Sequence, residues 1–145
     1  MKTVNILFLI TLAMGCVEAQ DIPQSQVPSV VTNAFHVAYP QASDIEWELH
    51  SPLYKVEFEI DRADHDLWFD KEGKVVKHKQ DIAIQDLPEA VTKTIQKDFS
   101  GYRVDDTDKI EEKGVVSYRV ELDGKPNDLM LTLSANGDVL EKRND

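Results

Sequence analysis

Potentially reactive side chains gather first in the segment Asp61-Arg62-Ala63-Asp64-His65-Asp66, which carries three carboxylates and one imidazole. Calcium favours oxygen-rich loops of this kind. The spacing is not that of an EF-hand, however, and the glycine that such a loop needs for its sharp turn is absent. The segment therefore predicts a solvated turn and no metal site. Calcium binding through Asp61, Asp64 and Asp66 is kept as an alternative.

Two further groups of potential metal ligands lead to the same expectation. Asp105, Asp106 and Asp108 are interpreted as an acidic loop. The histidines lie on different segments and lack a ligand spacing such as H-x-x-x-H on one helix, so we expect them at surface or edge positions. They are His36, His50, His65 and His78. The sequence predicts no zinc and no other cofactor.

Catalysis by acid and base needs two groups that face one substrate and have separated pKa values. The chain has many carboxylates, but no motif selects a pair. Glu57 and Glu121 occupy matching positions in two similar strands. Both are at polar positions of the apolar–polar alternation, where a glutamate is expected for solubility. The sequence also lacks a G-x-S-x-G motif and a P-loop lysine. It predicts a protein that is not an enzyme, with an enzyme of unrecognised type as an alternative.

Trp68 is the strongest candidate for a binding residue. In a strand, the alternation that buries Leu67 and Phe69 places the indole of Trp68 on the opposite face. One apolar ring within a charged surround is a common arrangement at recognition surfaces. The predicted partner-binding residues are Trp68, Glu57, Glu59, Glu46 and Lys55. In the alternative, Trp68 packs on the other half of the chain or beneath a loop.

The N-terminal segment, residues 1–19, predicts export. Lys2 precedes the apolar run 6–14, which is typical of a signal peptide and too short to span a membrane. The small-residue pattern ending at Ala19 suits signal peptidase, whereas Ala13-Met14-Gly15-Cys16 resembles a lipoprotein cleavage box, so lipidation of Cys16 is the alternative. We expect a periplasmic or secreted protein, or a lipoprotein. Cleavage after Ala19 leaves no cysteine for disulfide or thiol chemistry.

The overall charge excludes one class of partner. The chain has 27 Asp and Glu residues against 16 Lys and Arg residues, a formal net charge of −11. Proteins that bind nucleic acid through its phosphates need clustered cations. Nucleic acid is therefore not an expected partner, and the acidic balance serves solubility.

The candidate binding residues belong to a sequence repeat. With a shift of 60 residues, the segment beginning Val27-Pro28 aligns with the one beginning Leu87-Pro88. With a shift of 64 residues, Tyr54-Lys55-Val56-Glu57 aligns with Tyr118-Arg119-Val120-Glu121. The chain therefore contains two copies of one structural unit.

Each copy has the pattern of one helix followed by four strands. Helices are expected to begin at Pro28 and Pro88, because proline is tolerated at the first helical position. Strict alternation from Tyr54 to Ile60 predicts a strand with one buried face. The connections are too short for parallel crossovers, so antiparallel pairing is expected. Trp47 is predicted to lie in the core, and Met130 on the outer face.

These features resemble the PepSY-like family, whose members are described as beta-lactamase-inhibitor-like. The resemblance rests on the two helix starts, the paired Tyr-x-Val strands and the turns Asp70-Lys71-Glu72-Gly73 and Ser134-Ala135-Asn136-Gly137. It implies a small periplasmic or surface protein that binds another protein or peptide. No inhibitory motif can be transferred to this chain.

The sequence thus predicts an α+β protein of two tandem repeats, each with one helix followed by a four-stranded antiparallel meander, with both helices on one face of a joined sheet. The expected domains are a signal peptide at 1–19, a first PepSY-like repeat at 20–80 and a second at 81–145. The expected function is that of a secreted, non-enzymatic binding module that uses the open sheet face and inhibits an envelope or extracellular enzyme such as a peptidase or lactamase. The alternative is an envelope protein that binds calcium or a small ligand.

Overall fold

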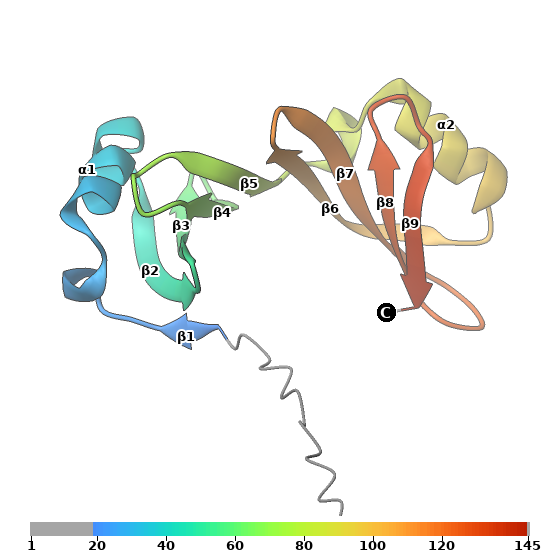
Figure 1. Ribbon diagram of the computed structural model, residues 1–145. Coiled ribbons are helices and arrows are strands. Elements are labelled where there is room, and N and C mark those ends of the chain that lie inside the picture. The colour runs from blue at the N-terminus through green and yellow to red at the C-terminus, as the bar shows by residue number, and fades with distance from the viewer. Residues whose placement is uncertain (1–18, 145) are drawn as a thin grey trace, which may run out of the picture.

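The computed structural model describes residues 19–144, so all of the predicted signal peptide except Ala19, Cys16 included, lies outside the described residues. Within that range the chain forms one antiparallel sheet of nine strands in chain order, together with two α-helices (Figure 1). The predicted mixed α+β class, with an antiparallel sheet and two helices, is confirmed.

The first half of the molecule follows the predicted order of helix and then strands, with one addition. A two-residue strand at the start of the described chain pairs with β2 and had no signal in the sequence. The elements are β1 (Gln20–Asp21), the 3-10 turn η1 (Gln24–Gln26), α1 (Ser29–Ala38), β2 (Ser43–His50), β3 (Leu53–Ile60), β4 (Ala63–Phe69) and β5 (Val75–Asp81).

The second half repeats this order. Its elements are the 3-10 turn η2 (Ile84–Asp86), α2 (Glu89–Asp98), β6 (Arg103–Glu112), β7 (Val115–Asp123), β8 (Leu129–Ser134) and β9 (Val139–Asn144). Pro28 and Pro88 cap the two helices and do not form their first residue, since both have extended backbone angles with ψ of 138° and 143°.

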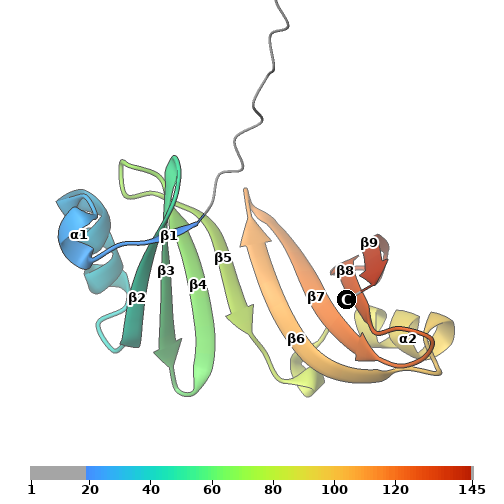
Figure 2. The same ribbon diagram turned by 90° about the horizontal axis from the view of Figure 1, so that it is seen from below.

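A single seam joins the halves. Strand β5 pairs antiparallel with β6, with Lys77 opposite Glu112 and Asp81 opposite Asp108. Figure 2 shows these two strands adjacent at the middle of the sheet, between one helix-bearing lobe and the other. The joining of the two sheets, a hypothesis from the sequence, is therefore present.

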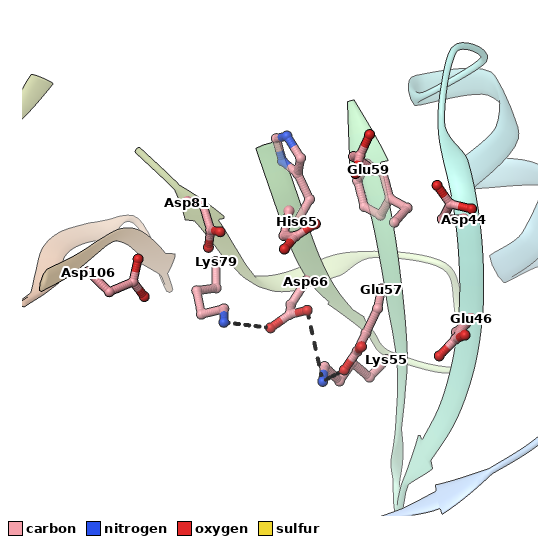
Figure 3. A pocket seen from close by; sticks show the side chains of 12 residues that line it. Asp44, Glu46, Lys55, Glu57, Glu59, His65, Asp66, Lys79, Asp81 and Asp106 are labelled. Atoms are coloured by element: carbon pink, nitrogen blue, oxygen red, sulfur yellow. Dashed lines mark hydrogen bonds and ion pairs between the residues drawn. The ribbon is translucent and has the colours of Figure 1, made fainter. Parts of the chain in front are cut away.

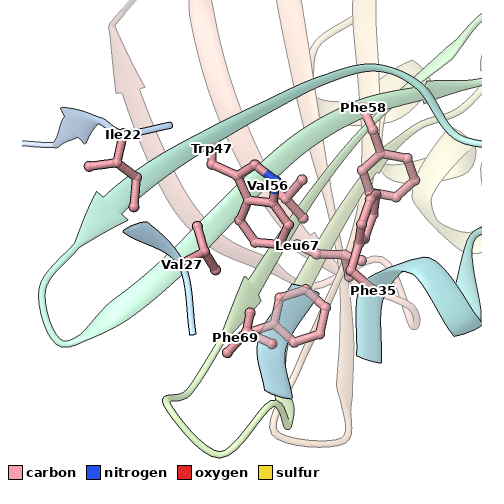
Figure 4. Close-up of a cluster of buried hydrophobic side chains, with 9 residues drawn as sticks. Ile22, Val27, Phe35, Trp47, Val56, Phe58, Leu67 and Phe69 are labelled. Atoms are coloured by element: carbon pink, nitrogen blue, oxygen red, sulfur yellow. The ribbon is translucent and has the colours of Figure 1, made fainter. Parts of the chain in front are cut away.

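Each half has its own hydrophobic core beneath its helix. In the first, Val31 and Phe35 of α1 pack against the strand residues Trp47, Val56 and Leu67 (Figure 4). Trp47 is 4% exposed, as predicted for a core residue. The second core is formed by Val91 and Ile95 of α2 together with apolar side chains of β7 and β8.

The structure corrects the interpretation of the acidic segments. Asp105, Asp106 and Asp108 lie inside β6 and not in a loop, and Asp108 is 1% exposed. In the other segment only Asp61 and Arg62 form the turn, because β4 begins at Ala63. Runs of aspartate usually favour turns, but here strand pairing on both sides of β6 overrides that local preference.

Candidate functional site

An acidic pocket of about 600 Å³ extends over strands β2 to β6 (Figure 3). Its lining includes eight carboxylic side chains but only two lysines, Lys55 and Lys79. The carboxylic side chains are those of Asp44, Glu46, Glu57, Glu59, Asp64, Asp66, Asp81 and Asp106. The arrangement concentrates negative potential in a concave surface and favours a cationic ligand.

Strand register explains why these side chains meet. Residues directly opposite each other in a sheet point to the same face, and successive residues alternate between faces. Glu57 lies opposite Glu46 on one side and Asp66 on the other, and Asp66 lies opposite Lys79. The alternate residue Val56 is fully buried beneath α1, so the acidic row lies on the face opposite the first core.

Of the predicted partner-binding residues, Lys55, Glu57, Glu59 and Glu46 line this pocket. Trp68 does not line it, but lies directly opposite Lys55 in the β3–β4 pairing. The structure therefore brings the five residues onto adjoining positions of β2, β3 and β4. Their role in binding stays a prediction.

Both lysines of the pocket are held by carboxylates. Lys79 Nζ lies 3.1 Å from Asp66 Oδ2, and Lys55 Nζ contacts Glu57 (Figure 3). Lys55 Nζ also lies 3.6 Å from Glu48 Oε2. Burial by itself would lower the pKa of Lys55, but the hydrogen bond to Glu57 and the charges of Asp66 and Glu48 outweigh it and raise the pKa. Lys55 is therefore a fixed cation, and its charge is already compensated.

Trp68 lies between two cations beside the pocket. Its ring centroid is 4.8 Å from Lys77 Nζ and 5.5 Å from Lys55 Nζ, distances at which cation–π attraction operates. The His50 ring approaches edge-on at 6.4 Å. These contacts hold the indole in place while leaving the side chain partly exposed.

A buried ion pair supports the pocket at the seam. Arg119 of β7 donates to Asp108 Oδ2 from Nε at 2.7 Å, and its Nη2 lies 2.6 Å from the same oxygen. Asp108 Oδ1 is buried and has no hydrogen-bond partner among the described residues. Lys79 Nζ lies 3.9 Å from that oxygen.

Asp81, which lines the pocket, lies directly opposite Asp108. Burial, a hydrogen bond with Asp108 and the nearby charges of Asp108, Asp106 and Asp64 raise the pKa of Asp81 to about 7. The Asp81 carboxyl is therefore partly protonated near neutral pH.

Sequence reasoning found Glu46 of β2 and the charged β3 residues of this pocket, but missed Asp44 of β2 and the charged residues on β4, β5 and β6. The missed residues are Asp44, Asp64, Asp66, Lys79, Asp81 and Asp106. Alternation identifies which residues of one strand share a face, but only the register between strands shows which of them are neighbours.

The histidine prediction was wrong for two residues. His65 is 7% exposed, and its Nδ1 lies 3.0 Å from His78 Nε2 across β4 and β5. The His65 ring also stacks on Phe58, with centroids 5.0 Å apart. Burial lowers the pKa of both imidazoles, and the His65 charge lowers that of His78 further. The two histidines are 13 residues apart in the sequence, and nothing in that spacing indicates that they meet across neighbouring strands.

Met130 also differs from its expected environment. Register places it opposite Glu121, in the polar phase of β8, yet it is only 9% exposed. It lines a second hollow of about 290 Å³ with Arg119 and Arg143. Its cross-strand neighbours Glu121 and Arg143 have long side chains, whose methylene groups pack well on apolar surface.

The described residues offer one group of carboxylates close enough to share a cation. Ligand atoms of Asp105, Glu121 and Asp123 lie within 4.8 Å of one another. The Arg103 guanidinium contacts both Asp105, at 2.9 Å, and Asp123, so a cation of the chain itself already occupies this position. The group does not include Asp61, Asp64 or Asp66, which the calcium alternative used.

Solved structures share this fold. A DUF2874 family protein from Bacteroides uniformis superposes with a TM-score of 0.73 at 22% identity, covering 81% of this chain and 88% of that one. A BLIP-like protein from Bacteroides fragilis gives a TM-score of 0.68 at 23% identity over 85% and 87% of the two chains. A protein from Bacteroides eggerthii, described as one of the "putative periplasmic proteins", gives 0.74 at 22% identity over 81% and 88%. At such identities the likeness concerns the fold alone.

No curated protein matches the chain. Neither helix within residues 19–144 is long and apolar enough to cross a membrane. The sequence profile of the family described as "Putative beta-lactamase-inhibitor-like, PepSY-like" matches twice, at residues 15–77 and 52–141, and together the matches span most of the sequence. The chain belongs to this PepSY-like, beta-lactamase-inhibitor-like family.

Proposed function

We propose that this chain is an exported, non-enzymatic binding module that holds a protein or peptide partner on the open face of its sheet. Residues 1–19 act as the signal peptide, and residues 20–80 and 81–145 are its two PepSY-like repeats. A periplasmic location fits the leader, and one solved structure of the same fold is described as periplasmic. A lipid on Cys16 would tether the same module to a membrane.

The proposed arrangement has both helices on one face, which leaves the other face free for the partner. Register supports it: Leu67, beneath α1, lies opposite His78, which lies opposite Glu111, and Glu111 lies opposite Val116, which packs against the second core. Paired residues share a face. The acidic pocket and Trp68 then occupy the uncovered side.

The observation that carries this function is the acidic pocket beside Trp68. Carboxylates outnumber lysines in its lining, and each lysine is already paired. Such a surface attracts lysine or arginine side chains of a partner, and the neighbouring indole offers an apolar anchor of the type that dominates interface energies. The partner would therefore present a basic segment next to an apolar side chain.

Inhibition of an enzyme is part of the proposal. The family description and the B. fragilis structure both carry the likeness to beta-lactamase inhibitors. A module that binds an enzyme through one rigid sheet face can block its active site without any chemistry of its own. The enzyme class that we propose is a peptidase or lactamase of the cell envelope or the extracellular space.

Affinity capture from an envelope fraction tests the proposal. The mature protein is compared with Trp68→Ala and with Glu57→Gln/Glu59→Gln, and Val37→Ala on the exposed surface of α1 serves as the matched control. A partner protein should be retained by the wild type and by the control. Trp68→Ala should reduce the affinity for this partner about tenfold. Added salt should reduce the affinity of the wild type, because it screens the acidic face. Equal retention by all four proteins would contradict the proposed face.

The captured protein is then assayed for its own activity with and without the module. Loss of the enzyme's activity when an equimolar amount of the wild-type module is added would support inhibition, provided that the Trp68→Ala module leaves the activity intact. Full activity in the complex would limit the proposal to binding.

A further inference from the structure

A second large pocket, of about 570 Å³, lies at the β5–β6 seam and shares no lining residue with the acidic pocket. A row of directly paired strand residues lines it. Leu67 lies opposite His78, which lies opposite Glu111, and Glu111 lies opposite Val116. Leu67 belongs to the first core, and Val116 packs against the second. This seam pocket therefore contacts side chains of both repeats.

The other sides of the seam pocket come from the ends of elements. Tyr39, at the end of α1, lines it, as do residues 74–76 at the start of β5 and residues 113–114 in the turn after β6. Lys77 lies opposite Glu112 at the limit of the paired region of β5 and β6 (Figure 2). Because the two strands are antiparallel, residues 74–76 and 113–114 meet at the same end of the seam.

The balance of charge in the seam pocket is opposite to that in the acidic pocket. Its lining carries three lysines and one carboxylate, Glu111. Glu111 is already compensated, because Lys109 Nζ lies 2.5 Å from its Oε1, and this contact lowers the pKa of Glu111. Lys77 makes the cation–π contact described above. Lys74 and Lys113 are exposed and form no ion pair within residues 19–144.

Aliphatic side chains supply much of the remaining lining. They are those of Leu67, Val75, Val76 and Val116, and the ring of Tyr39 joins them. Val75 is 43% exposed. A single exposed valine needs no explanation, but several apolar groups that share one concave surface are typical of a ligand site. The volume of about 570 Å³ lies within the range of small-molecule sites, roughly 300–1,000 Å³.

This lining restricts the chemistry of an occupant. A purely apolar molecule would leave the two unpaired ammonium groups unused, and a small inorganic anion would leave the aliphatic surface unused. A carboxylate attached to an aliphatic chain uses both, through charge-assisted hydrogen bonds and through burial of its methylene groups. The net charge of −11 repels anions in general, so such a ligand needs local cations. Lys74 and Lys113 are cations of this kind.

We propose that the seam pocket binds a small amphipathic carboxylate of the fatty-acid class. Its aliphatic chain lies along Val75, Val76 and Val116, and its carboxylate interacts with Lys74 and Lys113. A ligand in this position contacts both repeats and stabilises their joining. The site is independent of the partner face, because it uses neither the acidic pocket nor the ring of Trp68.

Octanoate is the probe for the test, at concentrations at which it stays monomeric. Methyl groups of Val75, Val76 and Val116 are followed by NMR while octanoate is titrated into the mature protein. We expect saturable shifts at these valines, with smaller changes at Val31 and Val91, which are fully buried in the two cores. Octylammonium, with the same chain and the opposite charge, should bind there at least tenfold more weakly. Absence of saturable shifts, or equal affinity for the two probes at these valines, would overturn the proposal.

Removal of the two unpaired charges provides the second arm. Lys74→Gln/Lys113→Gln changes only exposed side chains, so it should fold, and it should weaken octanoate binding at least tenfold. Lys97→Gln/Lys142→Gln is the matched control, because it removes the same charge from exposed lysines outside the pocket. The control should bind octanoate as the wild type does. Equal weakening in both double variants would reveal an effect of net charge alone and would overturn the proposal.

Partner capture separates this site from the partner face. Retention of the envelope partner by Lys74→Gln/Lys113→Gln, together with loss of octanoate binding, would support an independent ligand site. Octanoate should also raise the melting temperature of the wild type more than that of this variant, because it binds only the folded protein. Failure of octanoate binding in the wild type would overturn this inference and leave the partner face unaffected.

Discussion

The residue with the greatest electrostatic consequence is Asp108. Its side chain is 2% exposed, and Arg119 satisfies one of its oxygens through two contacts. A buried carboxylate is tolerated in a protein interior only when a cation or several donors compensate it. Arg119 therefore compensates the charge of Asp108. The second oxygen, Oδ1, depends on neighbouring groups at the seam for its stabilisation.

Removal of Arg119 should destabilise the protein strongly. We expect Arg119→Gln to lower the free energy of unfolding by about 3 kcal/mol, because it leaves the Asp108 charge buried and uncompensated. Urea denaturation measures the change. Arg103→Gln is the matched control, since Arg103 pairs with Asp105 and Asp123 at the surface and should cost less than about 1 kcal/mol. Equal effects of the two substitutions would contradict a special role for the buried pair.

The His65–His78 pair predicts a loss of stability in acid. Burial lowers the pKa of both groups, so the folded state favours neutral rings. Their contribution is fully present above an unfolded pKa of about 6.5 and is lost as the pH falls through the lower folded values. His65→Phe, which can still stack on Phe58, should remove part of this loss. Melting temperatures of variant and wild type at pH 7 and pH 5 measure it, and an identical dependence in both would contradict the assignment.

At the scale of elements, a glycine turn in each repeat approaches the helix. Gly73 has φ +84° and lies near Val30 of α1, while Gly137 has φ +86° and lies near Ala90 of α2. Thr94 of α2 also donates to the Gly137 carbonyl oxygen at 2.7 Å. The sequence predicted both turns from their glycines, but not that each turn is docked on a helix.

A side chain at Gly137 should separate this turn from α2. A Cβ there would lie 2.5 Å from the Ala90 carbonyl oxygen, and φ is positive as well. We expect Gly137→Ala to cost about 3 kcal/mol, the sum of backbone strain and overpacking. Gly114→Ala is the control, because its φ of +78° is similar but nothing lies within 4 Å of the added atom. It should cost about 1 kcal/mol in the same urea denaturation assay, and equal costs would show that the helix contact has no influence.

At the scale of the whole molecule, the β5–β6 seam decides whether the repeats act as one body. Asp81 and Asp108 lie opposite each other there, and a proton on Asp81 removes the repulsion between its carboxylate and the neighbouring negative charges. Asp106 and Asp64 add negative charge nearby, while Lys79 lies 3.9 Å from Asp108 Oδ1. Protonation therefore favours the joined sheet.

The seam should weaken as the pH rises. The pKa of Asp81 is about 7 in the folded protein against an ordinary 3.8, so its stabilising contribution is full below pH 3.8 and is lost as the pH rises through 7. Asp81→Asn keeps a donor at every pH. Its stability relative to wild type should increase between pH 5 and pH 8, by about 1 kcal/mol after allowance for solvent screening.

Thermal unfolding of both proteins across this pH range measures the difference. Glu46→Gln, at an exposed carboxylate of the same pocket that is not among the charges acting on Asp81, is the control and should show a smaller change. A pH-independent difference between Asp81→Asn and wild type would contradict the raised pKa of Asp81.

Much of this protein follows from local sequence. Alternation in Tyr54–Ile60 and in its copy defines which side chains are buried, because successive strand residues must point to opposite faces. The repeat itself, the paired helices and the glycine turns follow from periodicity and backbone preference. Four residues of the acidic pocket, Glu46, Lys55, Glu57 and Glu59, were found in this way.

The tertiary structure decided what depends on register between strands distant in sequence. Cross-strand pairing brought His65 next to His78 and Asp81 opposite Asp108. It also buried Asp108, which belongs to an acidic segment that the sequence predicts to be a loop. It also showed an apolar hollow beside Ile95 and Phe99 in the second repeat. Sequence patterns describe one element at a time, whereas proximity, burial of charge and empty volume arise only when elements pack together.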